Sequence, residues 1–292
     1  MSSQPSRKSV RLARLSAAVL PLALLSCARG GGEGNVAANA AATPTPAPMP
    51  MPTPSATPSA APAPAPLPSA TPVARAEKTD LIDYSFAYPA AAAAVPQVAA
   101  LLDKRAAAAR AEAVKEARED KKAATDAGFP FRAHYYHADW TVAADTPRFL
   151  SLVGEVATYT GGAHGMTVYQ PLLWDKQAGR EVDAADLFTS AAAAEAALRP
   201  RFCDALDGER AKKRGEPVTR SDEPFSDCID PMKETLVPAA SGAGAADGFT
   251  VYVAPYDAGP YAEGSYEIPV SVDAGVLKAI KPEYRGAFAA AK

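Results

Sequence analysis

A long proline-rich segment limits how much of this chain can fold. Residues 30–76 consist mainly of Gly, Ala, Pro, Thr and Ser with almost no charge, and prolines alternate mostly with small residues from Pro44 to Pro54 and again from Pro62 to Pro68. Such a composition cannot bury enough apolar surface to offset the entropy lost on ordering. Because proline holds φ near the polyproline II value, we expect a semi-rigid spacer that reaches on the order of 100 Å. Residues 27–77 are therefore predicted to be a disordered tether, either a stalk or an unselected spacer, and the fold is expected in residues 78–292.

The first 26 residues have the pattern of an export signal. Four basic residues come first: Arg7, Lys8, Arg11 and Arg14. The apolar run that follows, residues 15–25, is shorter than the about 20 residues of a membrane-spanning helix. It ends in Leu24-Leu25-Ser26-Cys27, which resembles the lipobox of bacterial lipoproteins. We predict a signal peptide over residues 1–26 and lipidation of Cys27; an ordinary signal peptide with a chance cysteine is the alternative.

Lipidation would place the protein at a membrane surface in the cell envelope. One acyl chain binds a membrane only marginally, whereas the two or three chains of a mature lipoprotein anchor it stably. Ala28, and not Asp, follows the cysteine. By resemblance to the sorting rule of Gram-negative lipoproteins, this residue favours the outer membrane, with the domain facing the periplasm.

The remaining residues, slightly more than 200, suit one domain that buries roughly 70% of the surface of its unfolded chain. The whole chain has 30 basic and 33 acidic residues and a pI near 5.7. No basic stripe with interleaved aromatic residues is present, so nucleic acid is not an expected partner. The sequence has no Gly-x-Ser-x-Gly motif, phosphate-binding loop or dinucleotide fingerprint, and we expect no cofactor. A catalytic carboxylate pair stays open, because such pairing is a property of the fold.

Two cysteines follow Cys27, at Cys203 and Cys228. In an oxidising compartment they predict one disulfide that closes a loop of about 25 residues and stabilises the domain by roughly 3 kcal/mol. A metal pair is the alternative, but no His or further Cys lies nearby at ligand spacing.

Hydrophobic patterning predicts an α+β fold, with a mainly antiparallel sheet packed against a long N-terminal helix and a second helix. Helices are expected over residues 97–126, after Ser190 as N-cap, and from Asp273, with a short helical turn over residues 183–188 and a break at Pro200. Strands are expected over residues 81–88, 129–143, 148–160, 166–175, 249–254 and 265–272, with a hairpin turn over 175–180.

Two separated motifs resemble a bacterial envelope family. The first is Tyr159-Thr160-Gly161-Gly162-Ala163-His164-Gly165, followed by Tyr169, Trp174-Asp175, Gly179 and Asp186-Leu187-Phe188. The second is Pro255-Tyr256, Gly259-Pro260-Tyr261 and Gly264. This pattern resembles the family catalogued as domain of unknown function 3298, which includes the C-terminal domain of RsiV-type anti-sigma factors. Tyr88-Pro89 and the long helix resemble a preceding PdaC-like region (domain of unknown function 4163 type) of some peptidoglycan deacetylases. The resemblance covers residues 80–277.

The resemblance implies a non-catalytic sensory or accessory module with an α+β fold, which in the anti-sigma factors binds lysozyme outside the cell. Two departures limit what it implies here. The chain shows no transmembrane helix or cytoplasmic sigma-binding segment, which argues against direct anti-sigma action. It also lacks the deacetylase domain with its Asp and His metal motifs.

His164 is the first candidate binding residue, together with Tyr159, Gly161 and Gly162 of the same turn. The glycines allow φ > 0 or a close approach to a partner, and His164 could contact a ligand or act as a general base. The alternative is a histidine that only holds the turn by hydrogen bonds to the backbone. No nucleophile lies near it in the sequence, so the catalytic residues, if any, are unknown.

Tyr256 and Tyr261 flank a Gly-Pro loop and are the second pair of candidate binding residues. Aromatic side chains on a rigidly held loop lose few rotamers on contact and are good anchors. Tyrosines that only cap the edge of a sheet are the alternative.

The H-x-x-H pair of His134 and His137 is a weak metal motif. On a strand the residues i and i+3 point to opposite faces, so no metal site is expected. Tyr135, Tyr136 and Trp140 are interpreted as strand packing, with a carbohydrate platform as the alternative.

These observations lead to one expectation of function and one alternative. We expect a cell-envelope lipoprotein whose non-catalytic domain binds or senses a lysozyme-like protein or peptidoglycan. The alternative is a hydrolase or deacetylase that modifies peptidoglycan, or its accessory domain.

Overall fold

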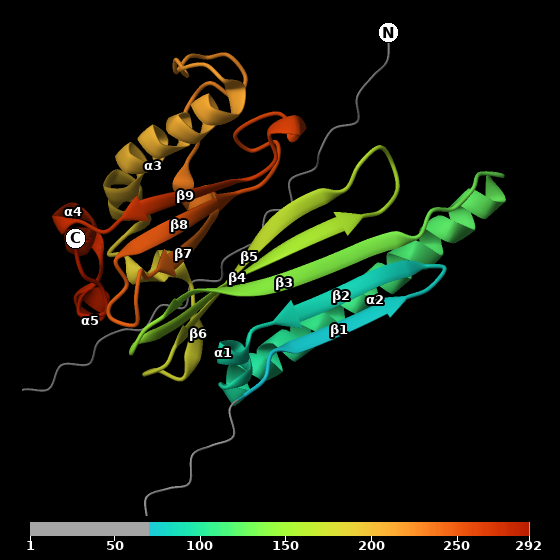
Figure 1. Ribbon diagram of the computed structural model, residues 1–292, viewed down its shortest axis with the longest axis horizontal. Helices are drawn as coiled ribbons and strands as arrows, with labels where there is room; N and C mark the ends of the chain where they lie inside the picture. The colour runs from blue at the N-terminus through green and yellow to red at the C-terminus, as the bar shows by residue number, and fades with distance from the viewer. Residues whose placement is uncertain (1–69, 292) are drawn as a thin grey trace, which may run out of the picture. The chain divides into compact units, whose positions relative to one another are not determined.

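The computed structural model describes residues 70–291 (Figure 1). The signal peptide, Cys27 and the tether up to residue 69 lie outside the described residues. The first part contains β1 (Val73–Lys78), β2 (Ile82–Tyr88), α1 (Ala90–Ala93), α2 (Pro96–Asp126), β3 (His134–Asp145), β4 (Phe149–Tyr159), β5 (Met166–Asp175) and β6 (Arg180–Val182). The second part contains η1 (Ala184–Leu187), α3 (Ala191–Arg214), η2 (Pro231–Lys233), β7 (Thr235–Ala239), β8 (Gly248–Val253), η3 (Tyr261–Glu263), β9 (Tyr266–Ser271), α4 (Ala274–Ala279) and α5 (Pro282–Arg285).

A six-stranded sheet in the order β1-β2-β3-β4-β5-β6 forms the first part. All neighbouring strands are antiparallel except β2 and β3, which are parallel because the long helix α2 connects them as a crossover. Figure 1 shows α2 running along β1 and β2. Every second residue of β2 is buried, and the core under α2 includes Val98, Leu102, Phe86 and Trp140.

Helix α2 ends in a Schellman motif, which directs the chain back towards β3. Gly128 adopts φ 73°, its N–H donates to the Thr125 carbonyl, and the N–H of Phe129 donates to the Ala124 carbonyl. These bonds satisfy carbonyl groups that the end of the helix would otherwise leave without partners. The last turn of α2 and residues 130–134 are thereby held next to each other.

Close packing inside the first sheet requires a glycine at position 154. A Cβ atom on Gly154 would lie 2.6 Å from Cε2 of Trp140, whose side chain is buried between strand and helix. The guanidinium of Arg105 on α2 covers the Trp140 ring at 5.4 Å from its centroid. A side chain at position 154 would therefore collide with the indole of its cross-strand partner.

An antiparallel three-stranded sheet, β7-β8-β9, forms the centre of the second part. Helix α3 packs on β9, and its buried residues Leu198, Phe202 and Leu206 join the core that contains Phe249 and Ile268. Ser190 caps this helix as predicted, by accepting a hydrogen bond from the N–H of Ala193.

The predicted helix break at Pro200 is wrong. Helix α3 runs through Pro200 without interruption to Arg214. Proline removes one backbone hydrogen bond, but the helix lies on the core through several buried residues on both sides of it, and tertiary packing supplies most of the stability of such helices.

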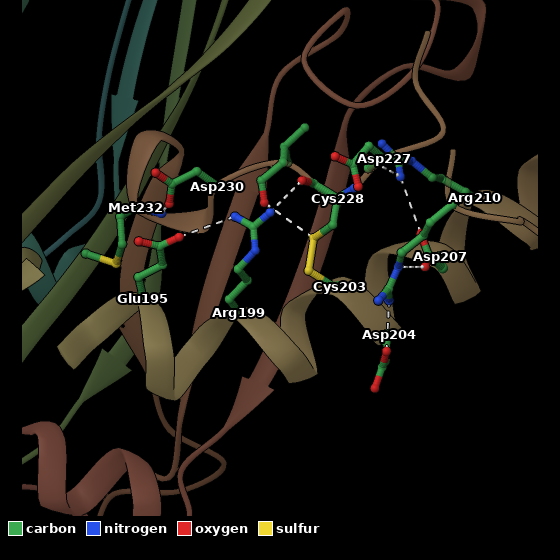
Figure 2. The surroundings of a disulfide bond; sticks show 12 residues. Glu195, Arg199, Cys203, Asp204, Asp207, Arg210, Asp227, Cys228, Asp230 and Met232 are labelled. Carbon is green, nitrogen blue, oxygen red and sulfur yellow. Dashed lines mark hydrogen bonds and ion pairs between the residues drawn. A yellow bond between two sulfur atoms is a disulfide. The ribbon is translucent and has the colours of Figure 1, made fainter. Parts of the chain in front are cut away.

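The predicted disulfide between Cys203 and Cys228 is confirmed (Figure 2). It ties α3 to the segment that leads into β7. Next to it, Arg199 donates to the Cys228 carbonyl at 3.0 Å. Arg210, whose side chain is fully buried, donates to the carbonyl groups of Asp227 at 2.9 Å and Ala258 at 2.9 Å. The same helix thus holds the disulfide segment and the loop between β8 and β9.

Hydrogen bonds and a contact between two rings join the second sheet to the first. The hydroxyl of Thr235 on β7 donates to the Tyr169 carbonyl on β5 at 3.1 Å, and the rings of Tyr169 and Tyr252 lie 5.0 Å apart. The N–H of Ala240 donates to the Ala143 carbonyl at 3.2 Å. Strand β7, which the sequence analysis missed together with β6, therefore connects the two sheets.

The predicted α+β class, with a mainly antiparallel sheet, a long helix and a second helix, is confirmed. The boundary between tether and domain at residue 78 is wrong, because Val73–Lys78 is strand β1 and pairs with β2 over its whole length. Two ion pairs hold this edge strand on α2, Arg75 with Asp103 and Glu77 with Arg110. Within residues 70–291, no helix has both the length and the apolar character needed to cross a bilayer.

Candidate ligand-binding site

The structure brings His164, Tyr256 and Tyr261 together in one aromatic cluster. His164 lies in the turn between β4 and β5, whereas both tyrosines come from the loop between β8 and β9. The rings of His164 and Tyr261 are stacked, with centroids 3.8 Å apart, and the rings of Tyr256 and Tyr261 lie 5.6 Å apart. Nε2 of His164 is 3.2 Å from the Tyr256 hydroxyl. Residues separated by about 90 positions in the sequence thus form one surface.

The turn that carries His164 depends on its glycines. Gly161 and Gly162 have φ of 98° and 89°, a region that residues with a side chain rarely adopt. A Cβ atom on Gly165 would lie 2.6 Å from the Thr158 carbonyl oxygen and would overlap the Tyr135 hydroxyl. The Tyr159 hydroxyl donates to the Gly162 carbonyl at 3.1 Å. Tyr159 and the glycines therefore shape this turn and present His164 to the loop between β8 and β9.

Both ring nitrogens of His164 are engaged. Nδ1 lies 2.9 Å from the Gly165 carbonyl oxygen, which can only accept a hydrogen bond, so Nδ1 carries the proton. In the neutral ring Nε2 is then an acceptor, and the Tyr256 hydroxyl donates to it. The Tyr256 hydroxyl and the Gly165 carbonyl together fix the orientation of the ring.

The loop with Tyr256 and Tyr261 is held by the basic end of α3. Arg214 forms an ion pair with Glu263 at 2.9 Å, and Lys213 donates to the Glu263 carbonyl at 2.7 Å. Glu263 also accepts from the hydroxyl of Tyr266, which is buried. The loop is therefore a rigid support for its aromatic side chains.

Tyr256 has an unusual backbone conformation. Its φ is 77°, and its side chain is among the large hydrophobic ones that stay exposed, with 47% of the residue accessible. A left-handed conformation costs a residue with a side chain about 1–2 kcal/mol. The fold thus holds an exposed tyrosine in a strained conformation, which is a common property of functional positions.

An acidic group near this loop was not found from the sequence. Burial, together with the negative charges of Asp257 and Asp230, raises the pKa of Glu234 to about 7. Burial also raises the pKa of Asp257, which follows Tyr256 directly. No local motif marks Glu234, since its pKa depends on burial by residues that are distant in the sequence.

Glu234→Gln is expected to stabilise the protein above pH 7 and to have little effect near pH 4. The pKa of Glu234 is higher in the folded than in the unfolded chain, so the protonated carboxyl group contributes to the free energy of unfolding. This stabilisation is fully present below the unfolded pKa and is lost as the pH rises through the folded pKa of about 7. After allowance for partial exposure, we expect a gain of about 1–2 kcal/mol at pH 8. Urea unfolding of the wild type and of the variant at pH 4 and at pH 8 measures this difference in the free energy of unfolding. Glu216→Gln, at an exposed position, is the control and should change neither value; an equal effect of both variants would contradict the prediction.

His134 and His137 do not share a site. His134 is buried, with Nε2 3.2 Å from Asp120, whereas His137 is partly exposed, with Nε2 3.2 Å from Asp83 on β2. Among the described residues, no three His, Cys, Asp or Glu side chains are grouped so that they could hold a metal ion. Trp140 is buried and Tyr136 stacks on Tyr84, as expected for strand packing.

One family model and two solved structures are similar to parts of this chain. Residues 75–167, from β1 into the start of β5, match the model of a family described as "Deacetylase PdaC". No curated protein sequence matches the chain. A solved DUF3298 family structure from Bacteroides fragilis NCTC 9343 is 19% identical, covers 72% of this chain and 91% of its own, and has a TM-score of 0.40. Another, from Pseudomonas aeruginosa PAO1, is 16% identical, covers 75% of this chain and 96% of its own, and also has a TM-score of 0.40. The family match supports the PdaC-like region predicted from the sequence, over residues 75–167.

Proposed function

We propose that this protein is a lipid-anchored protein of the cell envelope whose domain binds a ligand without catalysis. The ligand is a lysozyme-like protein or peptidoglycan, and the aromatic cluster of His164, Tyr256 and Tyr261 contacts it. The observation that carries the proposal is the convergence of these three side chains on a rigidly held loop, with Tyr256 exposed and strained.

Two features favour binding over catalysis. Both nitrogens of His164 have hydrogen-bond partners, so the orientation of the ring is fixed, as suits a contact surface. Tyrosine is enriched among the residues that contribute most to binding, because it offers a large contact area at low entropic cost.

The binding test uses sedimentation with purified peptidoglycan and titration with an immobilised lysozyme. We expect saturable binding to one of them, and at least tenfold weaker binding for Tyr256→Ala and for Tyr261→Ala. Phe129→Ala is the matched control, since Phe129 is an aromatic residue with 71% exposure outside the cluster. Absence of saturable binding to either ligand, or an equal loss in the control variant, would overturn the proposal.

The membrane anchor is tested separately. Mass spectrometry of the protein from membranes should find an N-terminus that begins at Cys27 and carries acyl chains, and Cys27→Ser should move the protein into the soluble fraction. An intact, unmodified N-terminus on cytosolic protein would contradict the localisation while leaving the binding test valid.

A second candidate function is modification of peptidoglycan by hydrolysis or deacetylation. The match of residues 75–167 to a family described as a deacetylase favours it, as does Glu234, whose pKa of about 7 suits proton transfer. Release of acetate or of soluble muropeptides by the purified protein would support this function. If Glu234→Gln and His164→Ala both left that release unchanged, neither residue would have the assigned role.

A further inference from the structure

We propose that a cavity at the C-terminal end of α2 binds a small zwitterionic ligand that carries one carboxylate and one ammonium group, as a short peptide with free ends does. The cavity is distinct from the aromatic cluster: it shares the turn between β4 and β5, but neither Tyr256 nor Tyr261 lines it. The proposal does not depend on the ligand of that cluster.

The cavity has a volume of about 420 Å³, within the range of small-molecule sites. Its walls come from three segments that the Schellman motif and the parallel pairing of β2 with β3 bring together. Asp120 comes from α2, Phe131 precedes β3, His134 begins β3, and Gly161 comes from the glycine turn.

A buried polar atom in the wall lacks a partner. His134 is 3% exposed, and its Nε2 lies 3.2 Å from the Asp120 carboxylate. Its Nδ1 makes no hydrogen bond within residues 70–291. Such an atom costs free energy when it is buried alone, and in native structures nearly all of them have a partner. A ligand in the cavity could reach Nδ1 only after the ring shifts, so the part of His134 in this site is to hold the Asp120 carboxylate through Nε2.

One side of the cavity suits a carboxylate. Arg132 is exposed and takes part in none of the ion pairs found within the described part of the chain. The N–H groups of Gly161 and Gly162 donate to no backbone carbonyl in residues 70–291. A guanidinium and adjacent free N–H groups are the donors that bind a carboxylate by charge-assisted hydrogen bonds.

The other side of the cavity suits an ammonium group. The Asp120 side chain is 56% exposed although it faces His134, so it keeps oxygen atoms free to accept. The nearby charge of Lys121 is already matched by Asp80 at 2.5 Å. With one free cation and one accessible carboxylate, the lining is complementary to a ligand that carries both charges and is poorly matched to a ligand with only one.

Isothermal titration of the full-length protein with alanyl-alanine tests this proposal, with the L,L and D,D forms titrated separately. We expect saturable binding of at least one form. N-acetylation, which removes the ammonium group, and amidation, which removes the carboxylate, should each weaken binding at least tenfold. Absence of saturable binding by both forms, or equal binding of the capped dipeptides, would overturn the proposal.

Two variants assign the charges. Arg132→Gln should weaken binding of the free dipeptide at least tenfold, and amidation of the dipeptide should then weaken binding to this variant little further. Asp120→Asn should likewise weaken binding of the free dipeptide at least tenfold, and N-acetylation should then weaken binding to that variant little further. Arg118→Gln and Glu119→Gln, at exposed positions of α2 outside the lining, are the matched controls and should bind as the wild type does. Equal losses in variants and controls would contradict the assignment. Tyr256→Ala should leave this titration unchanged, which separates it from the test of the aromatic cluster.

Discussion

Replacing Arg148 by Met is expected to lower the free energy of unfolding by about 3 kcal/mol, because it leaves a buried carboxylate without its counter-ion. Asp175 is 0% exposed. It accepts two hydrogen bonds from Arg148, at 2.8 Å from Nε and 2.7 Å from Nη2, and two more from the N–H groups of Gln177 and Ala178. The methionine keeps much of the apolar contact but cannot donate.

Urea unfolding at pH 7 measures this loss. Arg180→Met removes an exposed arginine from the same hairpin and is the matched control, which we expect to lie within about 0.5 kcal/mol of the wild type. Adding Asp175→Asn to Arg148→Met should recover part of the stability, since no buried charge then remains. A loss below about 1 kcal/mol for Arg148→Met would show that the pair behaves as a surface ion pair.

The same pair predicts an acid dependence of stability. Burial alone would raise the pKa of Asp175, but the hydrogen bonds from Arg148 and from the backbone outweigh it and lower the pKa below the usual value. The stabilisation is therefore present above the unfolded pKa of about 4 and is lost as pH falls through the folded pKa. In Arg148→Met this loss at low pH should disappear, which a urea series at decreasing pH would detect.

Removing the disulfide is expected to cost about 3 kcal/mol, because Cys203 and Cys228 are 25 positions apart and the bond restricts the unfolded chain. Both residues are buried, so Cys203→Ala with Cys228→Ala is preferred to serine, which would bury two hydroxyl groups. Urea unfolding of the oxidised wild type and of the double variant gives the difference.

The control for the disulfide prediction is a reducing agent, which should destabilise the wild type by a similar amount and leave the double variant unchanged. Arg210 donates to the carbonyl of Asp227, next to the disulfide, and to the carbonyl of Ala258 in the loop between β8 and β9, which carries Tyr256 and Tyr261. We therefore also expect weaker ligand binding by the double variant. Equal stability of the oxidised and reduced wild type would contradict the prediction.

Local sequence signals predicted the elements that depend on neighbouring residues. The run of Ala, Glu, Lys and Arg over residues 97–126 forms α2 almost as predicted, and Ser190 caps α3. The alternating patterns gave most of the strands of both sheets, and the two cysteines pair as their number implied. Propensity, capping and periodicity act within a few residues, so they can be read along the chain.

The tertiary structure decided what depends on residues that are distant in the sequence. It placed β1 on the sheet although this segment directly follows the proline-rich stretch, and it kept α3 intact through Pro200. It also brought His164 onto Tyr261, although nothing near either residue indicates the other. Burial and contact between distant segments determine these features, and the pKa of Glu234 follows from the same cause. The sequence thus identified the candidate binding residues, whereas tertiary packing determined which of them contact one another.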